Sequence, residues 1–165
     1  MLRILIVCSV LTGATSATAN PLERLQLVGQ SSMHWMFWKL YDVALYSADG
    51  RYQQGIRPLA LSITYAREIE SEKLIEATLG QWNRLSIEFS PGWVDRLRAI
   101  WPSVKPGDRL TFTTDQLHNN RFYLNGDLVG EFSDAQFAAA FLAIWLSVDT
   151  QEPEMRKALI GAANA

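Results

Sequence analysis

The segment from Met33 to Ser47 constrains the fold most, because it is rich in aromatic and β-branched residues and alternates with a period of two. Both of the faces created by this alternation are apolar, which is typical of a strand covered on each side. We therefore predict a central strand of a sheet. Residues 22–28 have a similar composition, and the turn-like residues 29–32 follow them. The sequence predicts a hairpin whose turn lies at residues 29–32.

The remaining sequence alternates between strand-like and helix-like blocks. Residues 59–67 alternate cleanly and are followed by two helical segments, the second of which begins at Ser90-Pro91. Strand-like alternation returns from residue 109 onward, with a strong hairpin signal at Asn125-Gly126, and two more helical segments complete the chain. This order lacks the β-α-β alternation of a parallel sheet. It predicts an α+β fold, with helices packed on one side of an antiparallel sheet.

Residues 1–19 have the features of a secretory signal peptide. Arg3 provides the positive charge, residues 4–11 form a short apolar stretch, and Ala17-Thr18-Ala19 matches a cleavage site. The apolar stretch is too short to span a bilayer, so we expect no membrane span after processing. We expect residues 20–165 to form a single domain, located in the periplasm or secreted. The only cysteine, Cys8, lies in the signal, and the core must therefore provide the stability.

Several common functional motifs are missing from the sequence. It contains no G-x-S-x-G motif and no glycine-rich phosphate loop, and a net charge of −2 gives no reason to expect a nucleic-acid partner. The two histidines, His34 and His118, are far apart in the sequence, so we expect no metal site and no cofactor. Asp42 is unusual within an apolar strand. We interpret it as a residue that meets a neighbouring cation or a strand end rather than as a catalytic acid.

Residues 37–46 (FWKLYDVALY) resemble the K-V-Y-x-x-A-L-Y strand of chalcone isomerase-like proteins. Residues 61–69, 107–108, 122–126 and 141–147 are also similar to the exported bacterial branch of that family, in the same order. The resemblance covers nearly all of the expected mature chain. It implies an open-faced β-sandwich, in which a large antiparallel sheet carries helices on one side and a cleft lies between the two layers.

The resemblance also implies two known activities. Plant enzymes of the family cyclise chalcones to flavanones, whereas other members bind fatty acids and hold the carboxylate with an arginine and a tyrosine on adjoining strands. Tyr41 matches that tyrosine, and the catalytic plant enzymes have a threonine there. The position of the arginine falls near Met33, whose side chain cannot bind an anion.

Two cations are candidates to replace that arginine. Lys39 shares the predicted strand face of Tyr41, and Arg67 ends an apolar strand face, where a cation can anchor a carboxylate. We therefore predict a ligand site whose polar end is Tyr41 with Arg67 or Lys39. The predicted apolar walls are Trp35, Phe37, Tyr65 and Trp82. In the alternative interpretation, Arg67 points into solvent and the aromatic residues fill the core.

The sequence favours an exported, non-catalytic protein that binds a fatty acid or a similar amphipathic small molecule. Such a protein needs a cleft and one anchor but no catalytic acid, base or nucleophile. Two alternatives stay open. One is an intramolecular lyase or isomerase of the chalcone–flavanone type, in which a cation stabilises an oxyanion and a tyrosine relays a proton. The other is a protein-interaction module of the cell envelope that uses an exposed aromatic face.

Overall fold

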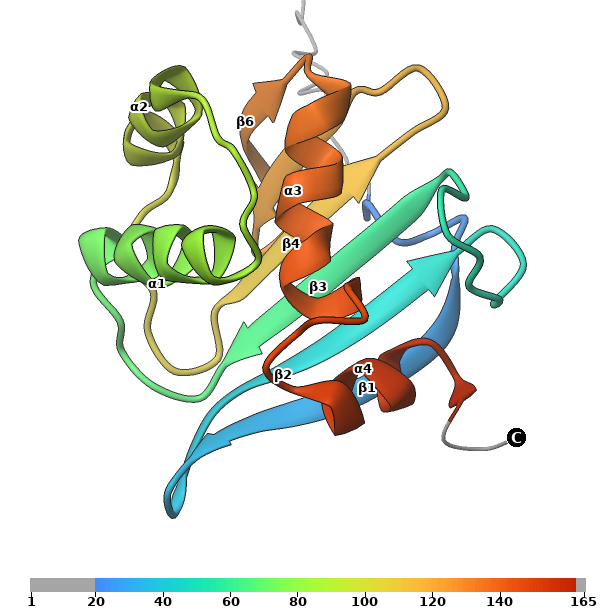
Figure 1. Cartoon of the computed structure of the whole chain (residues 1–165), viewed down its shortest axis with the longest axis horizontal. Coiled ribbons are helices and arrows are strands. Elements are labelled where there is room, and N and C mark those ends of the chain that lie inside the picture. The colour runs from blue at the N-terminus through green and yellow to red at the C-terminus, as the bar shows by residue number, and fades with distance from the viewer. Residues whose placement is uncertain (1–19, 163–165) are drawn as a thin grey trace, which may run out of the picture.

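The computed structural model describes residues 20–162, so the predicted signal peptide lies outside the described residues. Six strands form one antiparallel sheet in which the spatial order is the chain order. The strands are β1 (Gln26–Trp35), β2 (Trp38–Ser47), β3 (Leu59–Tyr65), β4 (Arg109–Thr114), β5 (Asn120–Leu124) and β6 (Asp127–Phe132). The helices are α1 (Ser71–Arg84), α2 (Pro91–Ile100), α3 (Ala135–Leu146) and α4 (Pro153–Leu159) (Figure 1).

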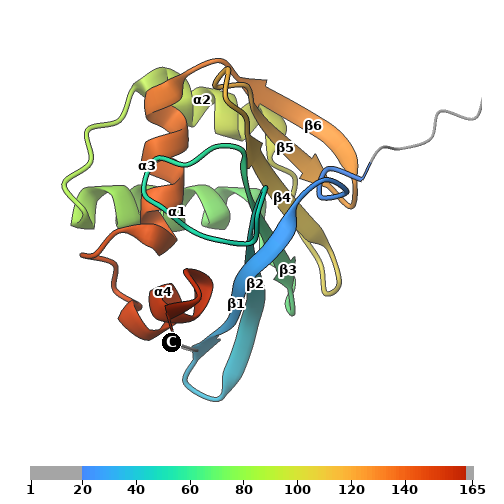
Figure 2. The ribbon, with the colours of Figure 1, turned by 90° about the vertical axis from the view of Figure 1, so that its right-hand side faces the viewer.

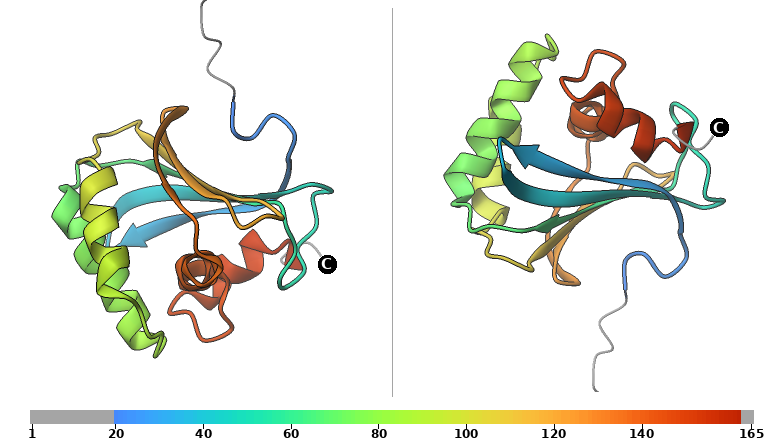
Figure 3. Two further views of the ribbon diagram at one scale, coloured as in Figure 1. Left: turned by 90° about the horizontal axis from the view of Figure 1, so that it is seen from above. Right: turned by 90° about the horizontal axis from the view of Figure 1, so that it is seen from below.

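All four helices lie on one side of the sheet (Figures 2 and 3). Helix α3 crosses the sheet in front of β3 and β4, and α4 lies against β1 and β2 (Figure 1). The opposite face carries small polar side chains near its centre, where Ser62 and Thr111 share a hydrogen bond of 3.2 Å between their hydroxyl oxygens. This arrangement confirms the predicted α+β open-faced sandwich.

The core between the layers is strongly aromatic. Phe112 on β4 and Phe122 on β5 meet Phe141 of α3, with ring centroids 4.8 and 5.2 Å away. Trp82 of α1 is fully buried, and its indole Nε1 donates a hydrogen bond of 2.9 Å to the carbonyl oxygen of Ala140. Because α1 and α3 share this contact, Trp82 joins the two helices as well as filling space between them.

The first hairpin differs from its prediction. Residues 29–32 continue β1 and pair with residues 42–45, whereas the turn lies at Met36 and Phe37. Gly29 does not form a turn: a Cβ atom at this position would lie 2.0 Å from the carbonyl oxygen of Ala158, so glycine here allows α4 to approach β1. Strand β2 is central as predicted, between β1 and β3, but helices cover only one of its faces.

Candidate functional site

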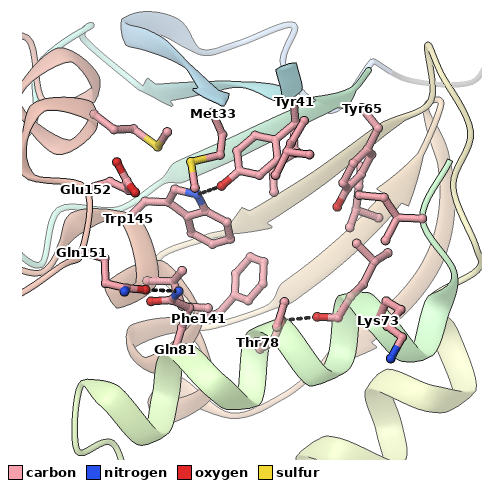
Figure 4. A pocket seen from close by; sticks show the side chains of 18 of the residues that line it. Met33, Tyr41, Tyr65, Lys73, Thr78, Gln81, Phe141, Trp145, Gln151 and Glu152 are labelled. Carbon is pink, nitrogen blue, oxygen red and sulfur yellow. Dashed lines mark hydrogen bonds between the residues drawn. The ribbon is translucent and has the colours of Figure 1, made fainter. Parts of the chain in front are cut away.

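A cavity of about 250 Å³ lies between the sheet and the helices (Figure 4). Its walls come from β1, β2 and β3 on one side and from α1, α3 and α4 on the other. Most of the lining side chains are apolar, among them Met33, Leu40, Ile63, Leu74, Phe141, Ile144 and Met155. Such a surface suits a hydrophobic molecule or the hydrocarbon part of an amphipathic one.

A β-bulge in β2 shapes the sheet wall of this cavity. Met33 pairs with Tyr41 and His34 pairs with Lys39, so Leu40 is an extra residue without a partner of its own. Leu40 and Tyr41 both line the cavity as a result. The same shift reverses the side-chain alternation, and Lys39 therefore lies on the opposite face of the sheet from Tyr41.

On that opposite face, Lys39 pairs with Asp42, with 2.6 Å between Lys39 Nζ and Asp42 Oδ2. The Ser32 hydroxyl also donates a hydrogen bond to this carboxylate. The hydrogen bond from Lys39, followed by that from Ser32, lowers the pKa of Asp42 below its ordinary value. These contacts confirm the interpretation of Asp42 as an ion-pair partner. They also engage Lys39 away from the cavity, which corrects its predicted position beside Tyr41.

Two tyrosine side chains reach the cavity from neighbouring strands. Tyr41 on β2 pairs with Tyr65 on β3, and their rings meet edge to face with centroids 6.3 Å apart. The indole Nε1 of Trp145 donates a hydrogen bond of 3.2 Å to the Tyr41 hydroxyl oxygen. No acceptor among residues 20–162 takes the Tyr41 hydroxyl proton. That proton is therefore free to bond to an oxygen atom of a ligand.

Burial keeps both phenols neutral. Desolvation raises the pKa of Tyr41 and that of Tyr65 above their usual value. Each hydroxyl group therefore stays protonated throughout the physiological pH range and acts as a hydrogen-bond donor rather than as a base. A neutral pair of donors in an apolar wall can orient a carbonyl or carboxyl oxygen without supplying a charge.

The polar side of the cavity is its rim, where α1 faces the segment between α3 and α4 (Figure 4). The Gln81 amide donates a hydrogen bond of 2.8 Å to Gln151 Oε1 and joins the two sides. Lys73 also lines the cavity and pairs with Glu76, with 2.7 Å between Nζ and Oε2. The Lys73 side chain is 63% exposed, so it can turn toward the charged end of a ligand at the rim.

The structure brings together only part of the predicted site. Tyr41 and Tyr65 line the cavity side by side. The guanidinium carbon of Arg67 lies 4.4 Å from the centre of the Trp38 ring, outside the cavity lining. The other predicted wall residues also lie elsewhere: Trp82 is buried in the core between helices, and Trp35 and Phe37 are exposed at the β1–β2 turn. Trp35 and Phe37 are displaced because the hairpin turn falls at residues 36 and 37, beyond the edge of the helices.

Lys73 is one of several cavity residues that the strand-based prediction did not find. Its signal in the sequence is the spacing of Lys73, Ala77 and Gln81, which places the three on one helical face. All three line the cavity.

Within residues 20–162, no cluster of three or more His, Cys, Asp or Glu side chains is arranged to hold a metal ion. No helix in this range has the length and apolar character needed to cross a membrane.

An antiparallel sheet with helices on one face and an apolar cavity between the layers defines an open-faced α+β sandwich. The chain belongs to the chalcone isomerase-like family, whose sequence model matches residues 12–161. It is 27% identical over 150 residues to an uncharacterized protein of Haemophilus influenzae, and the match covers 89% of this chain and 73% of that protein.

The fold is also similar to that of a solved structure, the fatty-acid binding protein of Arabidopsis thaliana. The two structures superpose with a TM-score of 0.66 at 11% sequence identity, over 86% of this chain and 89% of the other. At this level of identity, the similarity concerns the fold alone.

Proposed function

We propose that this protein binds, without catalysis, a fatty acid or a similar amphipathic small molecule in the cavity between sheet and helices. The observation that carries the proposal is the cavity itself, which combines apolar walls, two neutral tyrosine hydroxyls and a lysine at the rim. The shared fold with a protein named for fatty-acid binding supports the same function. The hydrocarbon chain lies inside, and the carboxylate lies at the rim close to Lys73.

The placement of the carboxylate follows from solvation. A carboxylate buried among neutral donors loses its hydration without gaining a counter-charge, which costs several kcal/mol. At the rim it keeps contact with water and gains attraction from Lys73. The Tyr41 hydroxyl, inside the cavity, then bonds only to a ligand that carries a further oxygen atom along its chain, such as a hydroxy fatty acid.

Met33 favours binding over the chalcone-flavanone type of catalysis. It lies directly across from Tyr41 on β1, where the family resemblance implies an arginine in the fatty-acid binders, and its thioether lines the cavity wall. A lyase of that type needs a cation beside the reacting oxygen to stabilise the oxyanion. The neutral phenol of Tyr41 and the thioether of Met33 provide no such positive charge.

Blocking the cavity is expected to abolish ligand binding. Ala77 lies on α1 at the cavity and is exposed, so Ala77→Trp adds a large side chain at the opening without disturbing the core. We expect the affinity for a fluorescent long-chain fatty acid, measured by titration, to fall at least about tenfold, equivalent to roughly 1.4 kcal/mol. Asn83→Trp, which is exposed on the same helix and lies outside the cavity lining, is the matched control and should bind normally. Equal affinities for the two variants would contradict the proposal.

The two anchors are expected to differ in the ligands that they affect. Lys73→Met should weaken binding of a free fatty acid by roughly three- to fivefold, in keeping with a partly exposed ion pair, and should leave its methyl ester unaffected. Tyr41→Phe should change neither affinity by more than about twofold, because neither ligand has an oxygen atom inside the cavity, and it should weaken a mid-chain hydroxy fatty acid by about two- to tenfold, because it removes one hydrogen bond. Calorimetric titration of these three ligands with each variant checks this expectation.

Lys157 offers a matched control for the lysine, since it forms the same kind of exposed pair with Glu154, at 2.7 Å, on α4. Lys157→Met should bind both ligands as the unmodified protein does. If Lys73→Met weakened the ester as much as the acid, the carboxylate would not lie beside Lys73.

The ligand itself can be identified by extracting the natively purified protein with organic solvent and analysing the extract by mass spectrometry. An acyl-chain compound in a stoichiometric amount is the expected result. A protein that carries none and binds no added fatty acid would overturn the proposal, and cyclisation of a chalcone above the background rate would revive the lyase alternative.

We also propose that the chain is exported and loses residues 1–19. The signal-like pattern of that segment supports this proposal. The intact mass of the protein recovered from the producing cells tests it: a chain that begins at Asn20 and leaves the cytoplasm is expected, and an unprocessed cytoplasmic chain would contradict it.

A further inference from the structure

Four consecutive large apolar residues are exposed where β1 turns into β2. Trp35, Met36, Phe37 and Trp38 are 63%, 72%, 93% and 54% exposed, and we call these residues the hairpin tip. The hairpin projects beyond the helices at the lower left of Figure 1, and Figure 2 shows the same projection from a second direction. A contiguous apolar surface of this kind marks an interaction site more often than it marks ordinary surface.

The hairpin tip has a defined shape. Trp35 and Trp38 form the last pair of the ladder, so the turn between them contains only Met36 and Phe37. Met36 has a φ angle of +55°, a conformation that glycine or asparagine adopts at lower cost. The turn thus carries an apolar residue where a polar turn-former would fit the backbone better. The result is a narrow apolar protrusion held by the sheet rather than a loose loop.

A narrow protrusion suits a deformable apolar partner better than a flat protein surface. Its two tryptophans flank the turn, and indole rings are amphipathic groups that settle at the headgroup level of a bilayer. The charge beside them is positive: the Arg67 guanidinium covers the Trp38 ring, and Arg67 forms no ion pair within residues 20–162. An uncompensated guanidinium next to an apolar protrusion complements the phosphate groups that cover the hydrocarbon of a bilayer.

We propose that the hairpin tip inserts into the surface of a phospholipid bilayer. The cavity lies directly behind the tip, because Met33 on β1 and Leu40 on β2 line it and lie two residues from Trp35 and Trp38. Insertion therefore brings the cavity next to the lipid, where an amphipathic molecule can pass between them. This last step rests on the proposed function, whereas insertion of the tip does not.

Flotation with phospholipid vesicles tests the insertion. We would use the chain from Asn20 onward, which keeps every described strand and helix and excludes the apolar stretch of residues 4–11. The vesicles would be phosphatidylcholine alone, or phosphatidylcholine with phosphatidylglycerol. We expect the protein to float with both kinds, and to remain bound in about 1 M salt, where exposed charges are screened beyond roughly 3 Å.

The variant Met36→Asn with Phe37→Ser removes the apolar apex, and asparagine suits the positive φ angle, so the fold should be kept. We expect its vesicle affinity to fall at least about tenfold, with an unchanged thermal unfolding midpoint. Leu117→Ser with Val148→Ser is the matched control, because these two residues are 81% and 74% exposed in other loops. This control should bind vesicles as the unmodified protein does.

Three results would overturn the inference: no flotation of the unmodified protein, equal flotation of the tip variant, or a dimer in solution that the tip variant dissociates. The cavity-blocked variant Ala77→Trp separates this inference from the proposed function. It should still float with vesicles after losing its fatty-acid affinity. A tip variant that keeps its fatty-acid affinity but no longer floats would support both proposals independently.

Discussion

Replacing Trp82 by alanine is expected to lower the free energy of unfolding by about 3–5 kcal/mol, the range typical of large aromatic residues deleted from a core. Trp82 is fully buried, and its ring lies against those of Phe89, Trp93 and Phe137, with centroids 5.3, 5.8 and 6.2 Å away. The substitution leaves a cavity among these rings and removes the hydrogen bond to Ala140 that joins α1 to α3. Chemical denaturation, followed by circular dichroism, measures the loss.

Trp35→Ala provides the comparison, because Trp35 is largely exposed at the hairpin tip. Its substitution should change the free energy of unfolding by less than about 0.5 kcal/mol, as is usual for surface positions. A similar loss for the two variants would mean that Trp82 does not hold the helical layer together. Sequence alone placed Trp82 in the ligand site, so this experiment also distinguishes a core role from a binding role.

Gly29→Ala is the second change with a large expected effect. The added methyl group would lie 2.0 Å from the carbonyl oxygen of Ala158 and 2.7 Å from that of Leu159. Both are backbone atoms, so the clash is relieved only if α4 moves away from β1. We expect a destabilisation of at least about 3 kcal/mol, at the upper end of the range for overpacked positions. Hydrogen exchange should show the loss of protection concentrated in residues 153–159.

Fatty-acid binding should weaken in the same variant, because α4 carries Met155 into the cavity wall. Gly80→Ala is the matched control. A Cβ atom at Gly80 meets nothing within 4 Å, and the residue lies inside α1, where alanine should stabilise the helix by about 0.5–1 kcal/mol. An unchanged stability of Gly29→Ala would contradict the close approach of α4 to β1.

Much of the fold can be predicted because its elements have clear periodicity. Residues 59–65 and 109–114 alternate in the sequence and form β3 and β4. The second helix begins at Ser90-Pro91 as predicted, and the Ser90 hydroxyl oxygen caps it by accepting a hydrogen bond from the Gly92 amide. The first hairpin could not be located in this way. Glycine is a typical turn residue, but Gly29 lies within β1 and allows α4 to approach that strand. Met36 and Phe37 form the turn, although neither is a typical turn residue.

The candidate site could be predicted in part, for a related reason. Tyr41 was found because strand alternation and the family resemblance both point to it, and Tyr65 because alternation places it on an apolar strand face. The structure places the two together at the cavity. The bulge at Leu40 could not be seen in the sequence, and it moves Lys39 to the other face of the sheet. Lys73 was missed because it lies on a helix, where only its spacing with Ala77 and Gln81 indicates a shared face.

The strands lie in the sheet in the same order as they occur in the chain, and this order affects how the protein folds during synthesis. Each strand pairs with its predecessor, so the sheet can grow in one direction as the chain is made, with no strand inserted between two earlier ones. Two of the helices that cover its apolar face, α3 and α4, follow all six strands in the chain. Until they dock, the side chains of Val43, Leu45 and Ile63 stay open to other apolar surfaces. The growing chain is thus most vulnerable to aggregation after β6 has formed and before α3 and α4 dock, and a chain cut short after β6 would keep that vulnerability permanently.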